Sequence, residues 1–328
     1  MNISVLGCGR WGGFIAWYLS SIGHRVFLWG KPGLPEIGPL MATRSNEWLR
    51  FDDKVVITDN LDDAIEHGSI IVISISSQNL RGFAKELTAY DLNGKTFVLC
   101  MKGLEEVSGK RLTEVFTESV SAELQAELQA ELKVAVWVGP GHVQDYIRGI
   151  PNCMVIDSLN GAVKDTLVPV FSSKLIRFYY GNDLIGNEIG AASKNVIGIA
   201  AGMLDGLEYV SLKGALMARG ANEISRLIKA AGGDPRSAFG LCHLGDYEAT
   251  LFSHHSQNRM FGESYIKGQA YSRLAEGAST VKAIMKMCEK YEVELPICQT
   301  VNSIIHEKMD ARDLLDNLFS RSIKSEFV

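Results

Sequence analysis

Hydrophobic and polar positions follow two different patterns in the two parts of this chain. Short, continuous apolar runs recur in the first part, among them NISVL at 2–6, SIIVIS at 69–74 and TFVLCM at 96–101. Runs of this length predict strands that are buried on both faces, as in a parallel sheet. We expect further strands in this part of the chain, at 24–29, 54–57, 134–138, 153–156 and 175–180.

Helical spacing separates several of these strands. We expect helices over 13–23, 61–68 and 78–88. A strand, a helix and a second strand within about 30 residues is the arrangement of a parallel crossover. The near-repeat AELQAELQAELK at 122–133 places its leucines on one stripe, which predicts a solvated helix packed on the sheet. A coiled-coil partner helix is the alternative for this repeat.

After about residue 182 the pattern becomes helical throughout. The segments at 187–207, 211–232, 272–291 and 295–307 all show apolar residues at helical spacing, and none reads convincingly as a strand. The sequence therefore predicts an α/β fold in which a doubly wound sheet over 1–181 precedes an all-helical domain over 182–328.

Composition and charge exclude several classes of protein. The chain has 328 residues, of which 46% are hydrophobic and 22% are charged, and its formal net charge is −5. This charge offers no basic surface for nucleic acid. We expect no membrane insertion, because no apolar stretch reaches the roughly 18 residues of a spanning helix, and no signal peptide. Six scattered cysteines without a CxxC pair favour free thiols in a reducing cytoplasm.

The turn after the first strand carries the pattern G-x-G-x-x-G at Gly7, Gly9 and Gly12. In such a turn the first glycine permits a tight bend, the second lets a pyrophosphate approach the backbone, and the third allows close packing of helix on strand. The following helix directs its positive N-terminus at the ligand. The strand–turn–helix context predicts a Rossmann-like dinucleotide-binding domain.

The end of the second strand bears on which dinucleotide is bound. An acidic residue there would bind the ribose hydroxyls of NAD, but this chain reads Trp29-Gly30-Lys31. Lys31 is a candidate for neutralising the 2′-phosphate of NADP, and an ordinary surface lysine is the alternative. We therefore expect NADPH or NADH as the cofactor, with a preference for NADPH or for dual use.

Longer motifs carry a resemblance to a known family. The chain resembles the bacterial type of NAD(P)-dependent glycerol-3-phosphate dehydrogenases. The matching segments are GCGRWGG (7–13), SQNLR (77–81), MKGLE (101–105), GPGH (139–142), EIGAASKNVIGIAAGMLDGL (188–207), ALMARGANEISRL (215–227), GLCHLGDYEATLFSHHSQNRMFG (240–262) and AEGASTVKA (275–283). They follow the order of the family and span nearly the whole chain.

The resemblance implies a reaction and its catalytic residues. The reaction is the reduction of dihydroxyacetone phosphate to sn-glycerol 3-phosphate, and its reverse, which supplies glycerol 3-phosphate for glycerophospholipid synthesis. Lys194 matches the catalytic lysine and Asn195 its neighbour, while Lys102 matches a lysine between cofactor and substrate. Asp246 matches the aspartate of the GLGD segment, and we expect it to orient Lys194.

The resemblance also implies the binding residues. The expected cofactor contacts are Gly7, Gly9, Arg10, Trp11, Gly12, Lys31, Ser77, Lys102, Val143, Gln257 and Glu276. The expected contacts of the small phosphate substrate are Lys102, Gly139, Gly141, Lys194, Asp246, Ser256, Gln257 and Asn258.

Three positions depart from the family pattern. Gly141 stands where the family has serine or threonine, Gln257 where it has arginine, and Ser76 where it has proline. A hydroxyl and a guanidinium near the substrate are thereby missing. Arg259 and Arg219 are candidates for the phosphate contact, although Arg219 is equally well read as a structural ion-pair residue. His142 is a further candidate for contact with the substrate.

The proposed chemistry suits a partly desolvated lysine. Reducing a ketone needs a hydride donor and an acid that protonates the developing alkoxide. Burial and a second cation both lower the pKa of a lysine, so that it can also act as a base. Lys194 has small apolar neighbours, and Lys102 is the candidate second cation. We expect Asn195 and Lys102 to polarise the substrate oxygen.

Two other functions remain open from the sequence. One is a related lysine-dependent dehydrogenase that acts on a hydroxyacid or on a ketopantoate-like carboxylate. The other is a dinucleotide-sensing protein that has lost catalysis, a reading motivated by Gly141 and Gln257. We expect no metal site, because the histidines near Asp246 lack ligand spacing. We expect a homodimer, the commonest homo-oligomer.

Overall fold

The computed structural model describes residues 1–121, 132–323 and 325–326, so the AELQ repeat expected to be helical lies almost wholly outside the described residues. The strands are β1 (Asn2–Leu6), β2 (Arg25–Trp29), β3 (Val55–Thr58), β4 (Ile70–Ile73), β5 (Thr96–Leu99), β6 (Lys133–Val138), β7 (Asn152–Asp157) and β8 (Ile176–Tyr180). Each of the expected strands is therefore present.

The strands form one sheet, in the order β3-β2-β1-β4-β5-β6-β7-β8. All neighbouring pairs are parallel except β6 and β7, which are antiparallel. The segment between these two strands contains only the five-residue helix α7 (Val143–Ile147). This helix is too short to cover a face of the sheet as a crossover helix does, and the chain turns back so that β7 runs antiparallel to β6.

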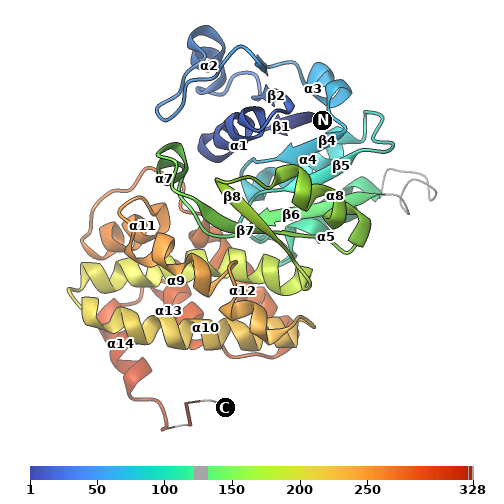
Figure 1. Ribbon diagram of the computed structural model, residues 1–328. Coiled ribbons are helices and arrows are strands. Elements are labelled where there is room, and N and C mark those ends of the chain that lie inside the picture. The colour runs from blue at the N-terminus through green and yellow to red at the C-terminus, as the bar shows by residue number, and fades with distance from the viewer. Residues whose placement is uncertain (122–131, 324, 327–328) are drawn as a thin grey trace.

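Helices cover both faces of this sheet (Figure 1). They are α1 (Arg10–Ser21), α2 (Ile37–Thr43), α3 (Leu61–His67), α4 (Leu80–Leu87), α5 (Leu112–Ser121), α7 and α8 (Gly161–Phe171), with the short 3-10 turn η1 (Ser77–Asn79) before α4. Along β4, Ile70 and Val72 face the core under α1 and α8, whereas Ile71 and Ile73 face the core under α3, α4 and α5. This double burial is why the strand is a continuous apolar run.

The helical part forms a separate layer (Figure 1). Its helices are α9 (Leu184–Gly206), α10 (Lys213–Ala230), α11 (Gln257–Ile266), α12 (Glu276–Tyr291), α13 (Pro296–Ile305) and α14 (Ala311–Phe319). Short turns η2 (Val210–Leu212), η3 (Pro235–Phe239), η4 (Leu244–Asp246) and the π-helical η5 (Glu248–Phe252) connect them. Helices α10 to α13 all contact α9, which is buried along most of its length. The α/β fold with a helical second part is confirmed.

The two parts are joined by more than the chain. Glu188, on the first turns of α9, accepts hydrogen bonds from the backbone N–H and the hydroxyl of Thr113 at 2.9 and 2.6 Å. It also forms a 2.7 Å ion pair with Arg111. Helix α9 thus caps the N-terminus of α5 in the sheet domain. The division at residues 181 and 182 stays a prediction, with β8 ending at Tyr180 and α9 beginning at Leu184.

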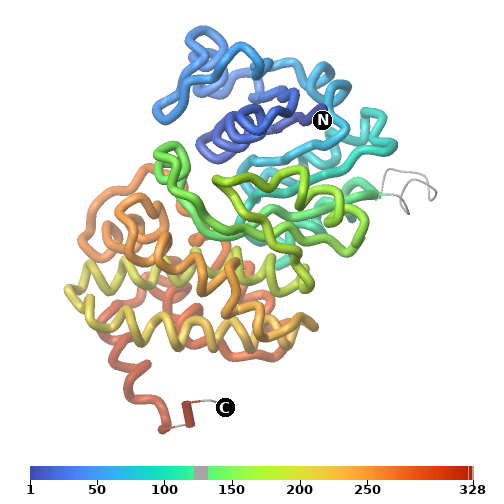
Figure 2. Tube along the Cα trace, in the orientation of Figure 1, coloured from blue at the N-terminus to red at the C-terminus, as the bar shows by residue number. Residues whose placement is uncertain are grey.

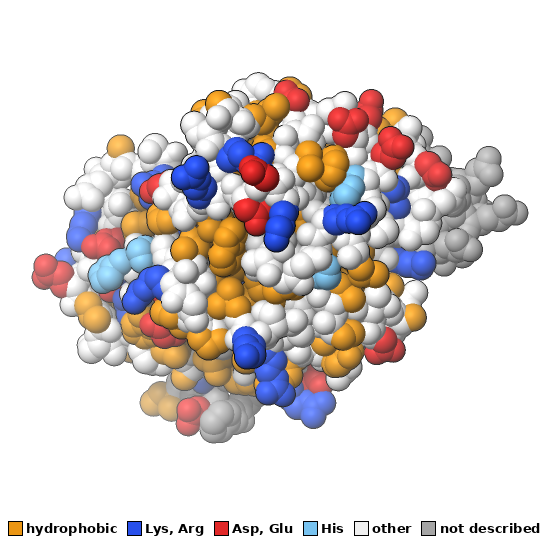
Figure 3. All heavy atoms as spheres, turned by 45° about the horizontal axis from the view of Figure 1, so that its top comes forward, with side chains coloured by type: hydrophobic (Ala, Val, Ile, Leu, Met, Phe, Trp, Pro, Cys, Tyr) orange, Lys and Arg blue, Asp and Glu red, His pale blue; other side chains and the backbone are white. Residues whose placement is uncertain are grey.

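In Figure 2 the N-terminus lies within the sheet part, and the segment after α14 lies at the end of the helical part that is farthest from the sheet. No helix among the described residues is long and apolar enough to cross a membrane. On the face shown in Figure 3, basic and acidic side chains are interspersed around apolar ones. All six cysteines are free thiols, and five of them are buried.

Candidate active site

A cleft of about 1060 Å³ lies between the carboxyl ends of the central strands and α9. Its walls include Gly7 after β1, Ser74 after β4 and Lys102 after β5, with Lys194 and Asn195 of α9 opposite them. Strand β1 lies between β2 and β4, so the order of the strands reverses here. Ligands of open α/β sheets bind at such a switch point.

The glycine turn forms one end of the cleft. Gly7 has a φ of +119°, and a Cβ on it would lie 2.1 Å from the carbonyl oxygen of Ser74. A Cβ on Gly12 would lie 1.8 Å from the carbonyl oxygen of Gly7, so helix and turn are in direct contact. A Cβ on Gly9 would meet nothing within 4 Å. The turn therefore leaves open space only where a ligand would approach the backbone.

Helix α1 begins directly after this turn and offers donors to an anion. Its N-cap, Gly9, supplies no side-chain cap, so the first N–H groups of the helix remain for a ligand. The indole N–H of Trp11 is buried and has no hydrogen-bond partner among the described residues. Both features fit the negatively charged diphosphate of a dinucleotide.

Two side chains of opposite charge line this end of the cleft. Lys31, two residues after β2, is exposed and lines the cleft. Glu36, which the sequence analysis did not single out, lines the same region. It precedes α2, a helix that we did not anticipate because its seven residues include a proline. A ribose hydroxyl and a 2′-phosphate would thus each find a partner of suitable charge.

Two lysines and one aspartate meet at the centre of the cleft. The Nζ atoms of Lys194 and of Lys102 each lie 2.9 Å from Oδ2 of Asp246. Asp246 is only 1% exposed, and its Oδ1 has no hydrogen-bond partner among the described residues. The expectation that Asp246 orients Lys194 agrees with this arrangement.

Burial changes the acidity of Lys194. Its pKa is lowered to about 8, chiefly by burial, and Lys102 lowers it further while Asp246 raises it. Its Nζ donates a 2.8 Å hydrogen bond to Oγ1 of Thr250, whose hydroxyl in turn donates to the carbonyl oxygen of Asp246. Thr250 was not expected from the sequence, although it lies four residues after Asp246, the spacing of one helical turn.

A chain of amides supports this centre. The amide nitrogen of Asn195 donates to the carbonyl oxygen of Lys102 at 2.8 Å, and that of Asn258 donates to Oδ1 of Asn195 at 3.0 Å. Oδ1 of Asn258 accepts from the N–H of Gly277 at 2.9 Å. Asn195 thus contacts both Lys102 and Asn258, and its part in polarising the substrate oxygen stays a prediction.

A glycine and a histidine close one side of the cleft. Gly141 has a φ of +135°, and a Cβ on it would lie 2.5 Å from the ring of Tyr146. The neighbouring His142 makes a 2.7 Å hydrogen bond from Nε2 to the carbonyl oxygen of Ala249. Burial lowers the pKa of His142 to about 4, with Lys194 acting in the same direction. His142 is therefore a neutral group of the cleft wall near pH 7.

Comparisons with known proteins identify this arrangement. Residues 2–164 match the family model described as NAD-dependent glycerol-3-phosphate dehydrogenase N-terminus, and residues 183–316 match its C-terminus. A glycerol-3-phosphate dehydrogenase [NAD(P)+] from Prosthecochloris aestuarii is 34% identical over 99% of this chain and 100% of its own length. The chain belongs to the NAD-dependent glycerol-3-phosphate dehydrogenase family.

Further relatives agree with this assignment. A glycerol-3-phosphate dehydrogenase [NAD(P)+] from Fusobacterium nucleatum is 33% identical, covering 99% of this chain and 98% of its own. The crystal structure of the glycerol-3-phosphate dehydrogenase from Coxiella burnetii superimposes with a TM-score of 0.89 at 25% identity, covering 97% and 98% of the two chains. The protein is thus an NAD(P)-dependent oxidoreductase, and the resemblance seen in the sequence is confirmed.

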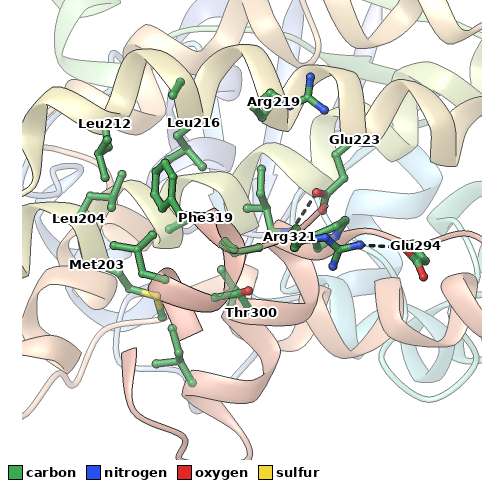
Figure 4. A pocket seen from close by; sticks show the side chains of 18 of the residues that line it. Met203, Leu204, Leu212, Leu216, Arg219, Glu223, Glu294, Thr300, Phe319 and Arg321 are labelled. Carbon is green, nitrogen blue, oxygen red and sulfur yellow. Dashed lines mark hydrogen bonds and ion pairs between the residues drawn. The ribbon is translucent and has the colours of Figure 1, made fainter. Parts of the chain in front are cut away.

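Two arginines proposed for phosphate contact in this dehydrogenase lie elsewhere. The guanidinium of Arg259 pairs with Asp205 at 2.6 Å on the far side of α11. Arg219 lines a second cavity, between α9, α10, α13 and α14 (Figure 4), and donates to the carbonyl oxygen of Glu326. Neither arginine lines the cleft, so the structure gives no support to a phosphate contact by either one.

Most of the other expected residues of the dehydrogenase do line the cleft. They are Gly7, Gly9, Arg10, Trp11, Lys31, Lys102, Gly141, Val143, Lys194, Asn195, Asp246, Ser256, Gln257, Asn258 and Glu276. Three of the expected contacts, Gly12, Ser77 and Gly139, instead lie behind its wall. Ser77 donates to Glu276 at 3.2 Å, and the carbonyl oxygen of Gly139 accepts from Lys102. We found no group of three metal-ligating side chains in the described part of the chain.

Proposed function

We propose that this protein interconverts dihydroxyacetone phosphate and sn-glycerol 3-phosphate by hydride transfer with NADH or NADPH. The observation that carries the proposal is the buried Lys194–Asp246 pair, placed in the cleft of a chain that matches this family over almost its full length. In the reducing direction, the ketone, one NAD(P)H and one proton give the alcohol and NAD(P)+.

The residues near the glycine turn would hold the dinucleotide. Gly9 and the first N–H groups of α1 suit the diphosphate, and the indole N–H of Trp11 is a donor without a protein partner. Lys31 and Glu36 would meet the ribose or its 2′-phosphate. A dinucleotide held by these residues would supply the hydride for the ketone carbon, or take it up from the alcohol carbon.

Lys194 would transfer the proton. Its ammonium group protonates the oxygen on which negative charge develops during reduction, and its neutral amine accepts the proton during oxidation. A pKa of about 8 makes both forms accessible near neutral pH. The Nζ of Lys102 would stabilise the same oxygen, since the Asp246 oxygen that it contacts is shared with Lys194. The unpartnered Oδ1 of Asp246 suits a hydroxyl of the substrate.

The start of α11 would bind the substrate phosphate. Ser256 accepts the N–H of Arg259, so the N–H groups of Gln257 and Asn258 are the first-turn donors left for an anion. The side-chain oxygen of Gln257 accepts from Tyr271 at 2.7 Å, and its amide nitrogen donates to the carbonyl oxygen of His255 at 3.4 Å, which leaves its second N–H for an anion. Both residues line the cleft. Backbone donors and an amide would thus replace the missing guanidinium.

The first experiment follows the oxidation of NADH and NADPH by purified protein at their nicotinamide absorbance. We expect consumption with dihydroxyacetone phosphate and none with free dihydroxyacetone, because the first turn of α11 recognises the phosphate. A parallel panel contains ketopantoate and small ketoacids. Turnover of a carboxylate and not of the phosphate would overturn the proposed substrate, and no turnover at all would favour a dinucleotide sensor.

Assembly, location and metabolic role are further parts of the proposal. We propose a cytoplasmic homodimer that supplies glycerol 3-phosphate for glycerophospholipid synthesis. Free thiols support the reducing compartment. Mass measurement in solution tests the dimer, and fractionation of cells tests the location. Complementation of a strain that requires glycerol 3-phosphate tests the role.

A further inference from the structure

A histidine and a tyrosine form a buried pair beneath the cleft. His243 and Tyr247 have no exposed surface. The hydroxyl of Tyr247 lies 2.6 Å from Nε2 of His243, and Nδ1 of His243 lies 2.9 Å from the carbonyl oxygen of Gly190. A carbonyl can only accept, so Nδ1 carries the proton and Nε2 accepts from Tyr247. Burial lowers the pKa of His243 to about 4, so the ring is neutral with one defined tautomer.

This pair connects the two segments that carry the central ion pair. His243 and Tyr247 lie on either side of Asp246 in the chain, and the N–H of Asp246 donates to the carbonyl oxygen of His243 at 3.0 Å. Gly190 lies four residues before Lys194 on α9, on the same side of the helix. One hydrogen-bonded chain therefore runs from α9 through His243 to the backbone of Asp246.

The packing leaves the pair little freedom to move. A Cβ on Gly190 would lie 3.1 Å from Cβ of His243, and a Cβ on Gly220 would lie 3.1 Å from the hydroxyl of Tyr247. Helices α9 and α10 thus approach the pair from two directions. Interiors packed at this density transmit small displacements to their neighbours.

We propose that His243 and Tyr247 are positioning residues of the reaction, which set the separation and orientation of Asp246 relative to Lys194. Neither side chain lines the cleft, so the pair acts through Asp246 without touching substrate or cofactor. This inference rests on the proposed function, because it assigns the pair to the proton transfer by Lys194.

The inference has a consequence for the acidity of Lys194. Burial and Lys102 lower the pKa of Lys194, whereas Asp246 raises it. Glu276 also raises this pKa, by a smaller amount. His142, on the other wall, is also close enough to interact with Lys194 but is neutral near pH 7. If Asp246 moves away, burial and Lys102 dominate the pKa of Lys194. The pKa of Lys194 then falls below about 8.

The test uses two variants that break the same hydrogen bond from its two ends. Tyr247→Phe removes the donor, and His243→Asn removes the acceptor while keeping a donor for Gly190. We expect each to lower kcat for ketone reduction about 10- to 100-fold, the range produced by misplaced catalytic groups. The KM for the dinucleotide should stay unchanged. The double variant should be no worse than either single one, because both remove one interaction.

The decisive readout is the pH dependence of reduction. We expect the midpoint at which activity falls with rising pH to move to lower pH in both variants. The control is Tyr18→Phe, which removes the hydroxyl of another fully buried tyrosine, one that donates to Phe171 in the sheet domain. Tyr18→Phe should lower the free energy of unfolding about as much as Tyr247→Phe does, without moving the midpoint of the pH profile. A smaller fraction of folded protein lowers only the maximal rate.

Two outcomes separate this inference from the proposed function. An unchanged midpoint in both variants, with kcat lowered no more than in Tyr18→Phe, would overturn the positioning role. Failure of the unaltered protein to reduce dihydroxyacetone phosphate would overturn the proposed function itself. Should Tyr247→Phe fail to fold, His243→Gln provides the second variant, because its amide reaches the position of Nε2 but gives up the donor to Gly190 and should also move the midpoint to lower pH.

Discussion

Lys102 and Lys194 share a single carboxylate oxygen, Oδ2 of Asp246, at 2.9 Å each. Two cations and one anion leave a net positive charge at the centre of the cleft. Such a charge would stabilise an oxygen that becomes negative during reaction. The lysines reach it from different domains, one from the segment after β5 and one from the middle of α9.

Replacing Lys194 tests the proton transfer. We expect Lys194→Ala to lower kcat about 10²- to 10⁴-fold, the contribution typical of a positioned acid or base. Dinucleotide affinity should be nearly unchanged, because the glycine turn lies at the other end of the cleft. Steady-state turnover and a fluorescence titration with NADH measure the two quantities. Lys267→Ala, on an exposed lysine paired with Glu263, is the control.

The two reaction directions should respond oppositely to pH. Reduction needs the protonated amine of Lys194, so its rate should fall as pH rises through the pKa of about 8. Oxidation needs the neutral amine, so its rate should increase through the same pH. Rate profiles in both directions, recorded between pH 6 and 10 at saturating dinucleotide, check this expectation. If both directions share one midpoint and Lys194→Arg abolishes it, the midpoint belongs to Lys194. If the rates of reduction and oxidation change with pH in the same direction, this assignment is wrong.

Restoring the hydroxyl usual in the family at position 141 should damage this protein. In Gly141→Ser the new Cβ meets the ring of Tyr146, and the backbone is held at a φ of +135°. We expect a loss of about 1–3 kcal/mol in the free energy of unfolding. Thermal or urea denaturation measures it. The same change in a Tyr146→Ala background should cost less, and an equal cost in both backgrounds would argue against steric conflict.

Lys31 should determine how well the protein uses NADPH. Removing an ionic hydrogen bond to the 2′-phosphate costs about 1.5–3 kcal/mol, which corresponds to roughly a 10- to 100-fold loss of affinity. We therefore expect Lys31→Ala to raise the KM for NADPH by this factor and to leave the KM for NADH unchanged. Glu36→Gln is the matched variant, expected to favour NADPH. Equal changes in the KM for NADPH and the KM for NADH would contradict this role of Lys31.

The strands could be predicted because burial on both faces leaves an unambiguous apolar run. β4 is the clearest case, with all four residues buried. Helices were harder where they were short or contained proline. Helix α7 has five residues, and α8 contains Pro169. The antiparallel direction of β7 was also not anticipated, because strand direction depends on whether the connection crosses over the sheet and leaves no trace in the strand itself.

The site could be predicted where a motif fixed a residue type, and less well where a side-chain direction mattered. The resemblance correctly indicated that Lys194 and Asp246 would meet. It did not reveal that the amide oxygens of Asn195 and Asn258 are used by protein donors. Nor could it show that Arg259 faces Asp205, since that depends on the rotation of α11 against α9.

The cap that Glu188 places on α5 limits how this protein can be recombined. Its carboxylate belongs to the helical half of the chain, yet its partners Arg111 and Thr113 belong to the other half. A chimaera that joined α9 to a foreign dinucleotide-binding domain would bury an acid without its cation, a cost of about 3–5 kcal/mol. The two halves of the chain therefore depend on each other. When one half is exchanged between relatives, the residues at positions 111, 113 and 188 must be kept as a set.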